Sequence, residues 1–190
     1  MQAHLRVKLY MLASSLFDEP DGEKTDFHFA LVSHLLRNGP ADWPFGGLLQ
    51  ALERDLVYGG EEALGGEYRR LFTGLDDGRV PPHAEHWMPR AARQKVVAAP
   101  GMAMLDACGD AGALIAQLEF MAYLIADDEN TRARQRDFHQ HCLARWVPRF
   151  AQAVFEETTQ PRYHLAAGFL LKLMAVEGAF LQRAQLRVAA

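Results

Sequence analysis

Cysteine is scarce in this sequence. The chain has 190 residues and contains two cysteines, Cys108 and Cys142. Two thiols cannot form a disulfide framework for a chain of this length, and they are too far apart for a Cys-x-x-Cys pair. Because disulfides are rare in cytosolic proteins, we expect both to be free thiols.

Long apolar segments are also lacking. The longest apolar-rich stretch, Leu165–Leu181, is interrupted by Lys172 and Glu177. The amino-terminal residues do not form the basic region and apolar segment of a secretion signal. We therefore expect a cytoplasmic protein that does not insert into a membrane.

The chain carries no excess of positive charge, its formal net charge being −4 with histidine neutral. Proteins that bind nucleic acids normally present a basic surface to the phosphates, so we do not expect a nucleic-acid partner. A mildly acidic protein is suited to a cationic partner, although many proteins without one carry a similar charge.

Motifs of catalysis and metal binding are missing as well. The sequence has no phosphate-binding loop, dinucleotide fingerprint, zinc-protease motif or nucleophile elbow. His83 and His86 flank Glu85 without a standard metal-ligand spacing, and His139 and His141 would point to different faces of a helix. We expect no catalytic residue, no metal and no cofactor.

What the chain does have is apolar residues at helical spacing. No period-two pattern is long enough to predict a strand. With 49% hydrophobic residues the chain can bury one substantial core. We predict a single all-α domain spanning residues 1–190, a bundle of about seven or eight helices.

Individual residues indicate where these helices begin and break. Thr25 and Asp42 are suited to cap the second and third helices. Pro161 fits the first turn of the last helix, and Pro148 is expected to kink or divide the helix that contains it. The Pro/Gly-rich region of residues 74–112 is expected to be a loop that can act as a hinge, with a short helix at Arg90–Ala98.

The stretch from Glu67 to Trp87 is the most informative part of the sequence. Tyr68 and Phe72 lie on one face of a helix end, which is followed by a glycine, an acidic turn and the pair Pro81-Pro82. An apolar helix end next to a stiff extended segment is a candidate binding surface.

This arrangement resembles the TorD/DmsD/NarJ family of chaperones for molybdenum-containing redox enzymes. The matching positions of the first block are Glu67, Tyr68, Leu71, Phe72, Gly74, Pro81, Pro82 and Trp87. Two further blocks, Leu118–Leu124 and Phe138–Phe150, follow in the order and spacing typical of the family. The Asp-His pair that family members often carry before the second block is replaced by Gly112 and Ala113.

The resemblance implies a function and a set of partners. It implies a system-specific chaperone that binds the twin-arginine signal peptide or the apo-form of a molybdoenzyme catalytic subunit, assists cofactor insertion and delays export until insertion is complete. It also implies that a homodimer can form by exchange of helices through the hinge region.

The peptide-binding residues expected from the matching blocks form one list. It comprises Glu67, Tyr68, Phe72, Pro81, Pro82, Trp87, Glu119, Tyr123, His141 and Trp146. Glu67 and Glu119 could accept a peptide arginine through its fork of donors, or could form internal ion pairs or helix caps. Phe72, Phe120 and Phe150 suit the core, whereas Trp87, in a polar loop, suits a ligand contact.

Two other classes of function remain as alternatives. One is an enzyme that binds or hydrolyses a nucleotide, which a phosphate-binding loop would favour. The other is a helical structural or regulatory subunit with a permanent partner, which a large exposed apolar patch would favour.

Overall fold

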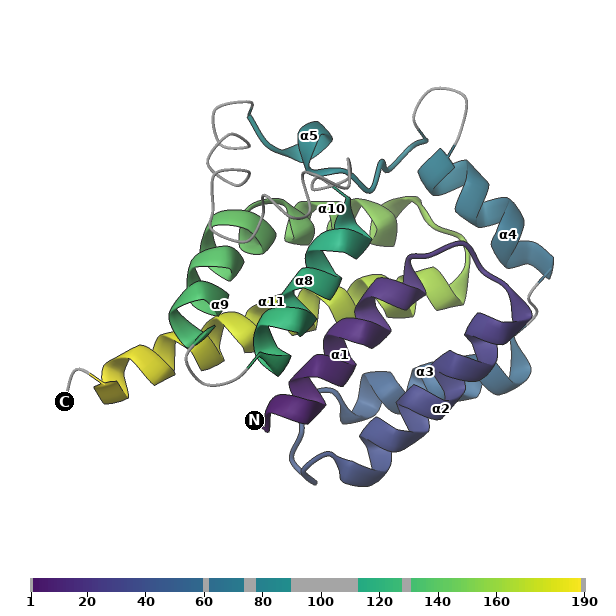
Figure 1. The fold of residues 1–190 in the computed structure, drawn as a ribbon. Helices are drawn as coiled ribbons and strands as arrows, with labels where there is room; N and C mark the ends of the chain where they lie inside the picture. The colour runs from purple at the N-terminus through teal and green to yellow at the C-terminus, as the bar shows by residue number, and fades with distance from the viewer. Residues whose placement is uncertain (1, 60–61, 74–77, 90–112, 128–130, 189–190) are drawn as a thin grey trace.

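The computed structural model describes residues 2–59, 62–73, 78–89, 113–127 and 131–188. Within these ranges the chain forms helices and one isolated bridge, between His83 and Ala113, and no strand. The expected all-α architecture is confirmed (Figure 1). The helices are α1 (Ala3–Leu16), α2 (Gly22–Asn38), α3 (Gly46–Tyr58), α4 (Glu62–Tyr68), α5 (Ala84–Trp87), α8 (Leu114–Ala126), α9 (Arg132–Phe138), α10 (Ala144–Glu157) and α11 (Pro161–Val188).

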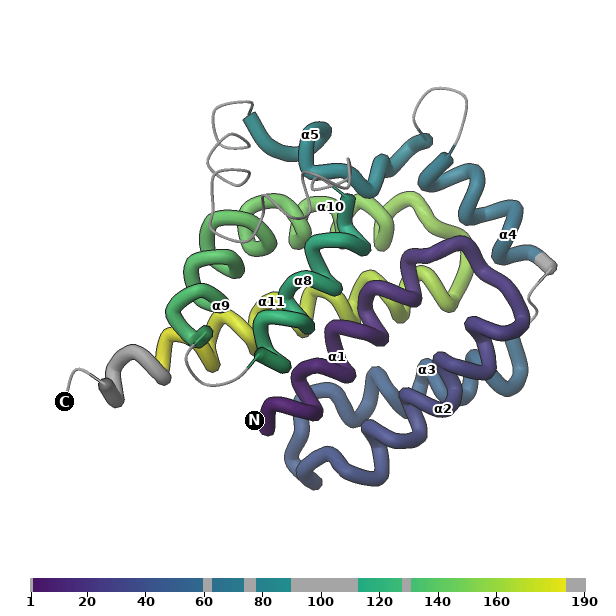
Figure 2. The backbone as a smooth tube through the Cα atoms, viewed as in Figure 1, coloured from purple at the N-terminus to yellow at the C-terminus, as the bar shows by residue number. Residues whose placement is uncertain are grey.

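The long helix α11 is the centre of the bundle. It contacts α1, α3, α9 and α10, and Figure 2 shows it running behind the other helices as the yellow-green tube. On one side of α11, helix α1 lies between α2 and α8, with which it also packs. α1 therefore contributes its inner face to the core and its outer face to the surface.

The core is built from the apolar faces that the periodicity indicates. Its largest fully buried side chains are Trp146, Tyr10, Phe17, Phe45, Phe150, Phe169, Leu9, Leu12, Leu35, Leu49, Leu52 and Leu71. Phe72 is buried, as expected, whereas Phe120 is only partly buried and packs against the ring of Phe138. Cys142 is a buried free thiol, and Cys108 lies outside the described residues.

Two helix starts differ from the sequence-based expectation. α2 is capped by Asp21, whose carboxylate accepts a hydrogen bond of 2.8 Å from the Lys24 N–H, and not by Thr25. α3 begins after Phe45 and not at Asp42. Phe45 makes no side-chain cap hydrogen bond, but it is fully buried. The residue before α3 is therefore held by packing in the core and not by a capping hydrogen bond.

The expected break at Pro148 occurs upstream of it. A π-helical turn at His139–Leu143 separates α9 from α10, and α10 then continues through Pro148. A second π-helical turn, Arg69–Thr73, follows α4. Pro148 is the fifth residue of α10, where it removes the hydrogen bond to the Ala144 carbonyl without ending the helix.

The segment after the first motif is held in place by backbone contacts. The Val80 N–H donates to the Leu71 carbonyl at 2.8 Å, and the Leu114 N–H donates to the Pro82 carbonyl at 2.9 Å. Pro81-Pro82 therefore lies beside the start of α8. Most of the expected hinge, namely residues 74–77 and 90–112 with the helix proposed at Arg90–Ala98, is outside the part of the chain described above.

Helix α11 has a markedly apolar stretch. By length and composition its Pro161–Arg183 stretch could cross a membrane, and it is the one such helix in the described chain. It carries Glu177, which is fully buried, and one side of it packs into the bundle through residues such as Phe169 and Leu173. Its apolar character is therefore explained by its place at the centre of the bundle.

A buried ion pair joins the first and last helices. The guanidinium of Arg6 on α1 donates to both carboxylate oxygens of Glu177 on α11 and, at 2.8 Å, to the side-chain oxygen of Gln135 on α9. Arg6 is 3% exposed and Glu177 is 0% exposed. The Phe180 ring lies 4.6 Å from the guanidinium carbon of Arg6. This group fixes three helices to one another.

A second buried carboxylate, Glu67, joins α4 to the turn between α10 and α11. It accepts hydrogen bonds from Arg70 at 2.8 and 2.9 Å, from the Thr158 hydroxyl at 2.8 Å and from the Thr159 N–H at 2.9 Å. These bonds, led by those from Arg70, lower the pKa of Glu67 from 4.5 to about 2. Glu67 therefore stays charged in the folded protein.

Replacing Glu177 with glutamine is expected to destabilise the protein by about 3 to 5 kcal/mol, because the Arg6 charge would stay buried without a counter-charge. Urea denaturation of the variant measures this loss. Lys24→Gln breaks the partly exposed pairs with Asp18 and Asp21 and is the control, with an expected cost of about 1 kcal/mol or less. Equal stability losses in the two variants would contradict a special role of the buried pair.

Acid unfolding is expected to depend on Glu67. The unfolded chain takes up a proton near pH 4.5, whereas the folded protein keeps this carboxylate charged until about pH 2. Stability that Glu67 contributes is thus complete above the unfolded pKa and is lost as the pH falls through this window. In Glu67→Gln the free energy of unfolding should vary less with pH there, as denaturation at a series of pH values would show. An unchanged slope would refute the prediction.

Candidate functional site

The sequence-predicted site residues fall into two environments. Several of them belong to an aromatic cluster around Phe150. The Phe72 ring lies 6.0 Å from that of Phe150, the Trp146 ring 5.9 Å and the Trp87 ring 6.2 Å, all measured between centroids. This cluster is continuous with the core and gives these side chains a packing role.

Trp146, which we expected at the peptide site, lies in the core. It is 0% exposed, and its indole N–H donates to the Gln117 side-chain oxygen at 3.0 Å. A buried tryptophan needs such a partner for its polar atom. Trp146 therefore belongs to the core in this structure and does not present a surface to a peptide.

Trp87 and the two prolines form an internally braced segment. The Trp87 indole N–H donates to the Pro81 carbonyl at 2.8 Å, and the Arg149 guanidinium donates to the Trp87 carbonyl at 3.4 Å. Trp87, Pro81 and Pro82 are half-buried. The indole N–H of Trp87 is thus already hydrogen-bonded within the segment. Only the ring surface of Trp87 is left for contact with a ligand.

The two expected acidic residues differ in their surroundings. Glu67 already accepts four hydrogen bonds and pairs with Arg70, which corresponds to the internal ion pair among the interpretations of this residue. Glu119 is exposed on α8 and makes no hydrogen bond or ion pair with the residues that the structure describes. Partial burial, and then the negative charge of Asp18, raise the pKa of Glu119.

Glu119 lines a hollow that we call the acidic groove. The groove has a volume of about 310 Å³ and lies between α1, α2 and α8. Its lining residues are Met11, Ser14, Ser15, Asp18, Phe27, Ile115, Glu119 and Ala122. Met11 is 39% exposed and Phe27 is 42% exposed, which is high for large apolar side chains. The groove thus combines exposed apolar surface with two carboxylates.

The local charge at this end of α1 is negative. Lys24 pairs with Asp18 at 3.0 Å and with Asp21 at 3.3 Å, and it neutralises one of these carboxylates. Glu119 has no such cation among the described residues. A cationic group placed near Glu119 would therefore favour its charged form and offset both the cost of its partial desolvation and the repulsion from Asp18.

Two further predicted residues lie near the acidic groove. The charge of Asp18, after burial, contributes to a raised pKa of the Tyr68 hydroxyl, so Tyr68 and Glu119 both respond to the same carboxylate. Tyr123 is one helical turn beyond Glu119, is 59% exposed and stacks on Phe120. His141 is exposed on the π-helical turn after α9 and does not line the groove.

Apart from Glu119, the groove residues were missed by the reasoning from sequence, among them Met11, Asp18 and Phe27. For Met11 on α1 and Phe27 on α2 the signal was a position off the buried apolar stripe of the helix. Asp18 lies past the end of α1 and carried no such signal. Met11 interrupts the spacing of the buried Leu5, Leu9 and Leu12, so it points away from the core. Large apolar residues outside the buried stripe indicate a contact surface only when they gather, and that required the fold.

Metal binding has no geometric support in the part of the chain that the structure covers. No three His, Cys, Asp or Glu side chains there come together in an arrangement that could hold a metal ion. The acidic groove contains two carboxylates and two serine hydroxyls but no histidine or cysteine. Its chemistry suits a guanidinium or ammonium group.

Comparisons with known proteins bear on the fold and the family of this chain. A crystal structure described as that of a proposed redox enzyme maturation protein from Archaeoglobus fulgidus is similar, with a TM-score of 0.55 and 18% sequence identity over 96% of each chain. At this level of identity the similarity concerns the fold. Curated protein sequences give no significant match.

A family model described as nitrate reductase delta subunit matches residues 40–152. The matched region contains the Glu67–Trp87 motif, all of α8 and most of α10, and it is more than half of the chain. The chain therefore belongs to the nitrate reductase delta subunit family.

Proposed function

We propose that this protein is a cytoplasmic maturation chaperone that binds the twin-arginine leader, or the apo-form, of a molybdoenzyme catalytic subunit. It would assist cofactor insertion and delay export until insertion is complete. The family is one of redox-enzyme maturation chaperones and not of enzymes, so the protein is not an enzyme. The observation that supports the finer proposal is the acidic groove with its unpaired Glu119.

A twin-arginine leader has two parts that match this groove. Its arginines would meet Asp18 and Glu119, and its apolar, helix-forming part would cover Met11, Phe27 and Ile115. Arginine suits a carboxylate because its planar fork can donate two parallel hydrogen bonds. Apolar burial would supply affinity, and the charges would supply orientation and selectivity.

Within this proposal the predicted residues have two kinds of role. Glu119, Tyr68 and Tyr123 border the bound leader. Glu67, Phe72, Trp146 and the braced Pro81–Trp87 segment hold the surrounding helices in position, with the ring surface of Trp87 as a further contact. His141 would take part only if the client extends beyond the leader to the α9–α10 surface.

The single-domain organisation is part of the same proposal. One core connects the described helices from α1 to α11, and α11 contacts helices from both halves of the chain. A homodimer formed by exchange of helices through residues 74–112 remains a prediction, because most of that segment is outside the described ranges.

Glu119→Gln is expected to weaken binding of a twin-arginine leader peptide by about threefold to tenfold, since a charged hydrogen bond to arginine becomes a neutral one. Isothermal titration calorimetry of the full-length protein with leaders of candidate molybdoenzymes would measure this change. Glu156→Gln, the same change on the exposed face of α10, is the matched control and should bind like the wild type.

Two results would count against the proposal. Folded wild-type protein that binds no leader at any ionic strength would exclude leader recognition. A leader that binds Glu119→Gln as tightly as wild type would place the arginine site elsewhere on the molecule. Circular dichroism of each variant would confirm that the fold is intact.

A further inference from the structure

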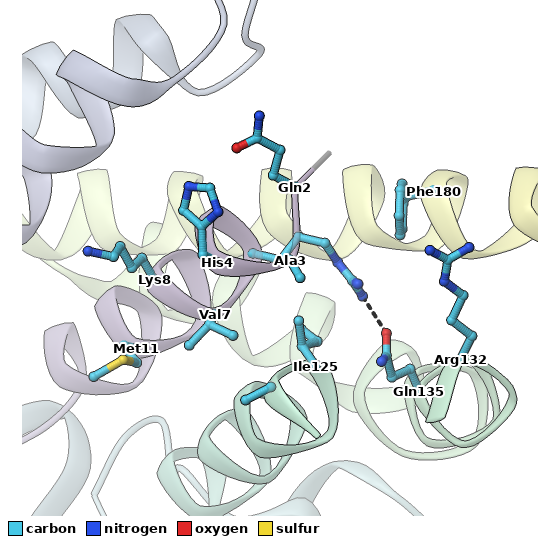
Figure 3. Close-up of a pocket in the computed structure, with 12 residues that line it drawn as sticks. Gln2, Ala3, His4, Val7, Lys8, Met11, Ile125, Arg132, Gln135 and Phe180 are labelled. Carbon is cyan, nitrogen blue, oxygen red and sulfur yellow. Dashed lines mark hydrogen bonds between the residues drawn. The ribbon is translucent and has the colours of Figure 1, made fainter. Parts of the chain in front are cut away.

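A second hollow lies on the same face of the protein, at the amino-terminal end of α1. It has a volume of about 680 Å³. Its lining residues are Gln2, Ala3, His4, Arg6, Val7, Lys8, Met11, Ile125, Ala126, Arg132, Gln135 and Phe180. Figure 3 shows His4 and Lys8 on one side, Arg132 on the other, and Val7 and Ile125 between them. We call it the basic hollow.

The basic hollow has the opposite charge to the acidic groove. Lys8 and Arg132 line it, and no aspartate or glutamate is among its described lining residues. The charge of Arg6 beneath it is matched by Glu177. Lys8 forms no ion pair with any residue in the described ranges. The hollow is therefore suited to an anionic group.

The two hollows are neighbours on the surface. Met11 lines both of them. The lining residues follow one another from Ala3 through Met11 along α1 to Asp18, just past the end of α1, and on α8 they run from Ala126 back to Ile115. The two hollows therefore follow one another along the packed pair α1 and α8, and we call them together the trough.

The trough has a charge polarity along α1. Lys8 is on α1 and Asp18 lies just past its end; about ten residues of helical rise correspond to roughly 15 Å. Apolar side chains, namely Val7, Met11 and Ala122, lie between the two ends. A ligand that covers the whole trough must therefore carry a cation at one end and an anion at the other.

We propose that the trough binds one amphipathic helical segment of the client, with its arginine at Asp18 and Glu119 and a carboxylate about ten residues later at Lys8. This inference rests on the proposed function and adds the polarity and spacing of the bound segment. The segment then runs antiparallel to α1. Its intervening apolar residues cover Met11 and the walls of the trough.

The dipole of the bound helix favours the same direction. A segment whose arginines precede its apolar part has its amino-terminal end at the acidic groove and its carboxyl-terminal end at the basic hollow. The positive end of its dipole then faces Asp18 and Glu119, and the negative end faces Lys8 and Arg132. In the reverse direction each dipole end would face like charge.

A probe peptide of about 18 residues tests the inference, since helices of this length begin to be stable in water. It carries two arginines near its amino-terminus, a run of leucine and alanine, and one glutamate about ten residues after the second arginine. Changing this glutamate to glutamine should weaken binding to the wild-type protein by about twofold to fivefold. Calorimetry at low and moderate salt measures the affinities.

The same peptide change should have no effect on Lys8→Gln protein if the two groups are partners. Lys172→Gln, an exposed lysine on α11 that lines neither hollow, is the matched control and should retain the wild-type response. A second peptide, with the glutamate about four residues after the arginines, reaches only about 6 Å and should gain nothing from Lys8.

The outcomes separate this inference from the proposed function. Suppose that Glu119→Gln weakens binding of the arginine-bearing peptide, but the effect of the peptide glutamate on affinity is the same in Lys8→Gln and wild type. The bound segment then does not span both ends of the trough and the inference is wrong, while leader binding stands. Equal affinity for a peptide with its charges exchanged would also overturn it. If no arginine-bearing peptide binds, the proposed function itself fails.

Discussion

The buried pair between Arg6 and Glu177 is the interaction on which the surface of this protein depends. It joins the first helix to the last, across most of the chain, and a third helix contributes Gln135. A buried pair of this kind adds little net stability compared with apolar packing, but a helix that shifts would leave a bare charge in the core. It therefore selects one placement of α1. The outer face of α1 lines the trough, so the buried pair that positions α1 also positions the trough.

Glu67 and Glu119 show how the environment separates two residues of one type. Both lie in segments shared with the family and both are on largely apolar helices. Hydrogen bonds from Arg70 and from the Thr158–Thr159 turn lower the pKa of Glu67, and its carboxylate is fully used inside the protein. Partial burial raises the pKa of Glu119, which has no cation beside it among the described residues. A satisfied carboxylate holds helices together, whereas one that is partly desolvated and unpaired gains most from a cation supplied by a partner.

Much of the fold could be read from the sequence, because apolar spacing reports directly on which helix face is buried. The helical class, α1, the end of α2 and the start of α11 at Pro161 follow from that spacing and from local turn residues. The failures have tertiary causes. Phe45 precedes α3 as a buried anchor, and the break before α10 is a π-helical turn rather than Pro148. The site was harder to predict from the sequence. Glu119 could be named from its motif, but the groove that it lines combines residues from α1, α2 and α8. No local pattern records that three helices meet there.

The division of α1 between core and trough has an energetic consequence. Its inner residues, such as Leu9 and Leu12, are fully buried, whereas Met11 on the outer face leaves apolar surface in contact with water. The exposed part of Met11 does not contribute the free energy of apolar burial that it would contribute inside the core. A ligand that covers Met11 recovers it, and because the ligand binds the folded chain alone, its binding energy adds to the stability of the bundle. Methionine is suited to such a position, since its flexible thioether can adapt to ligands of different shape. The surface that costs the free protein stability is thus the surface through which a client would stabilise it.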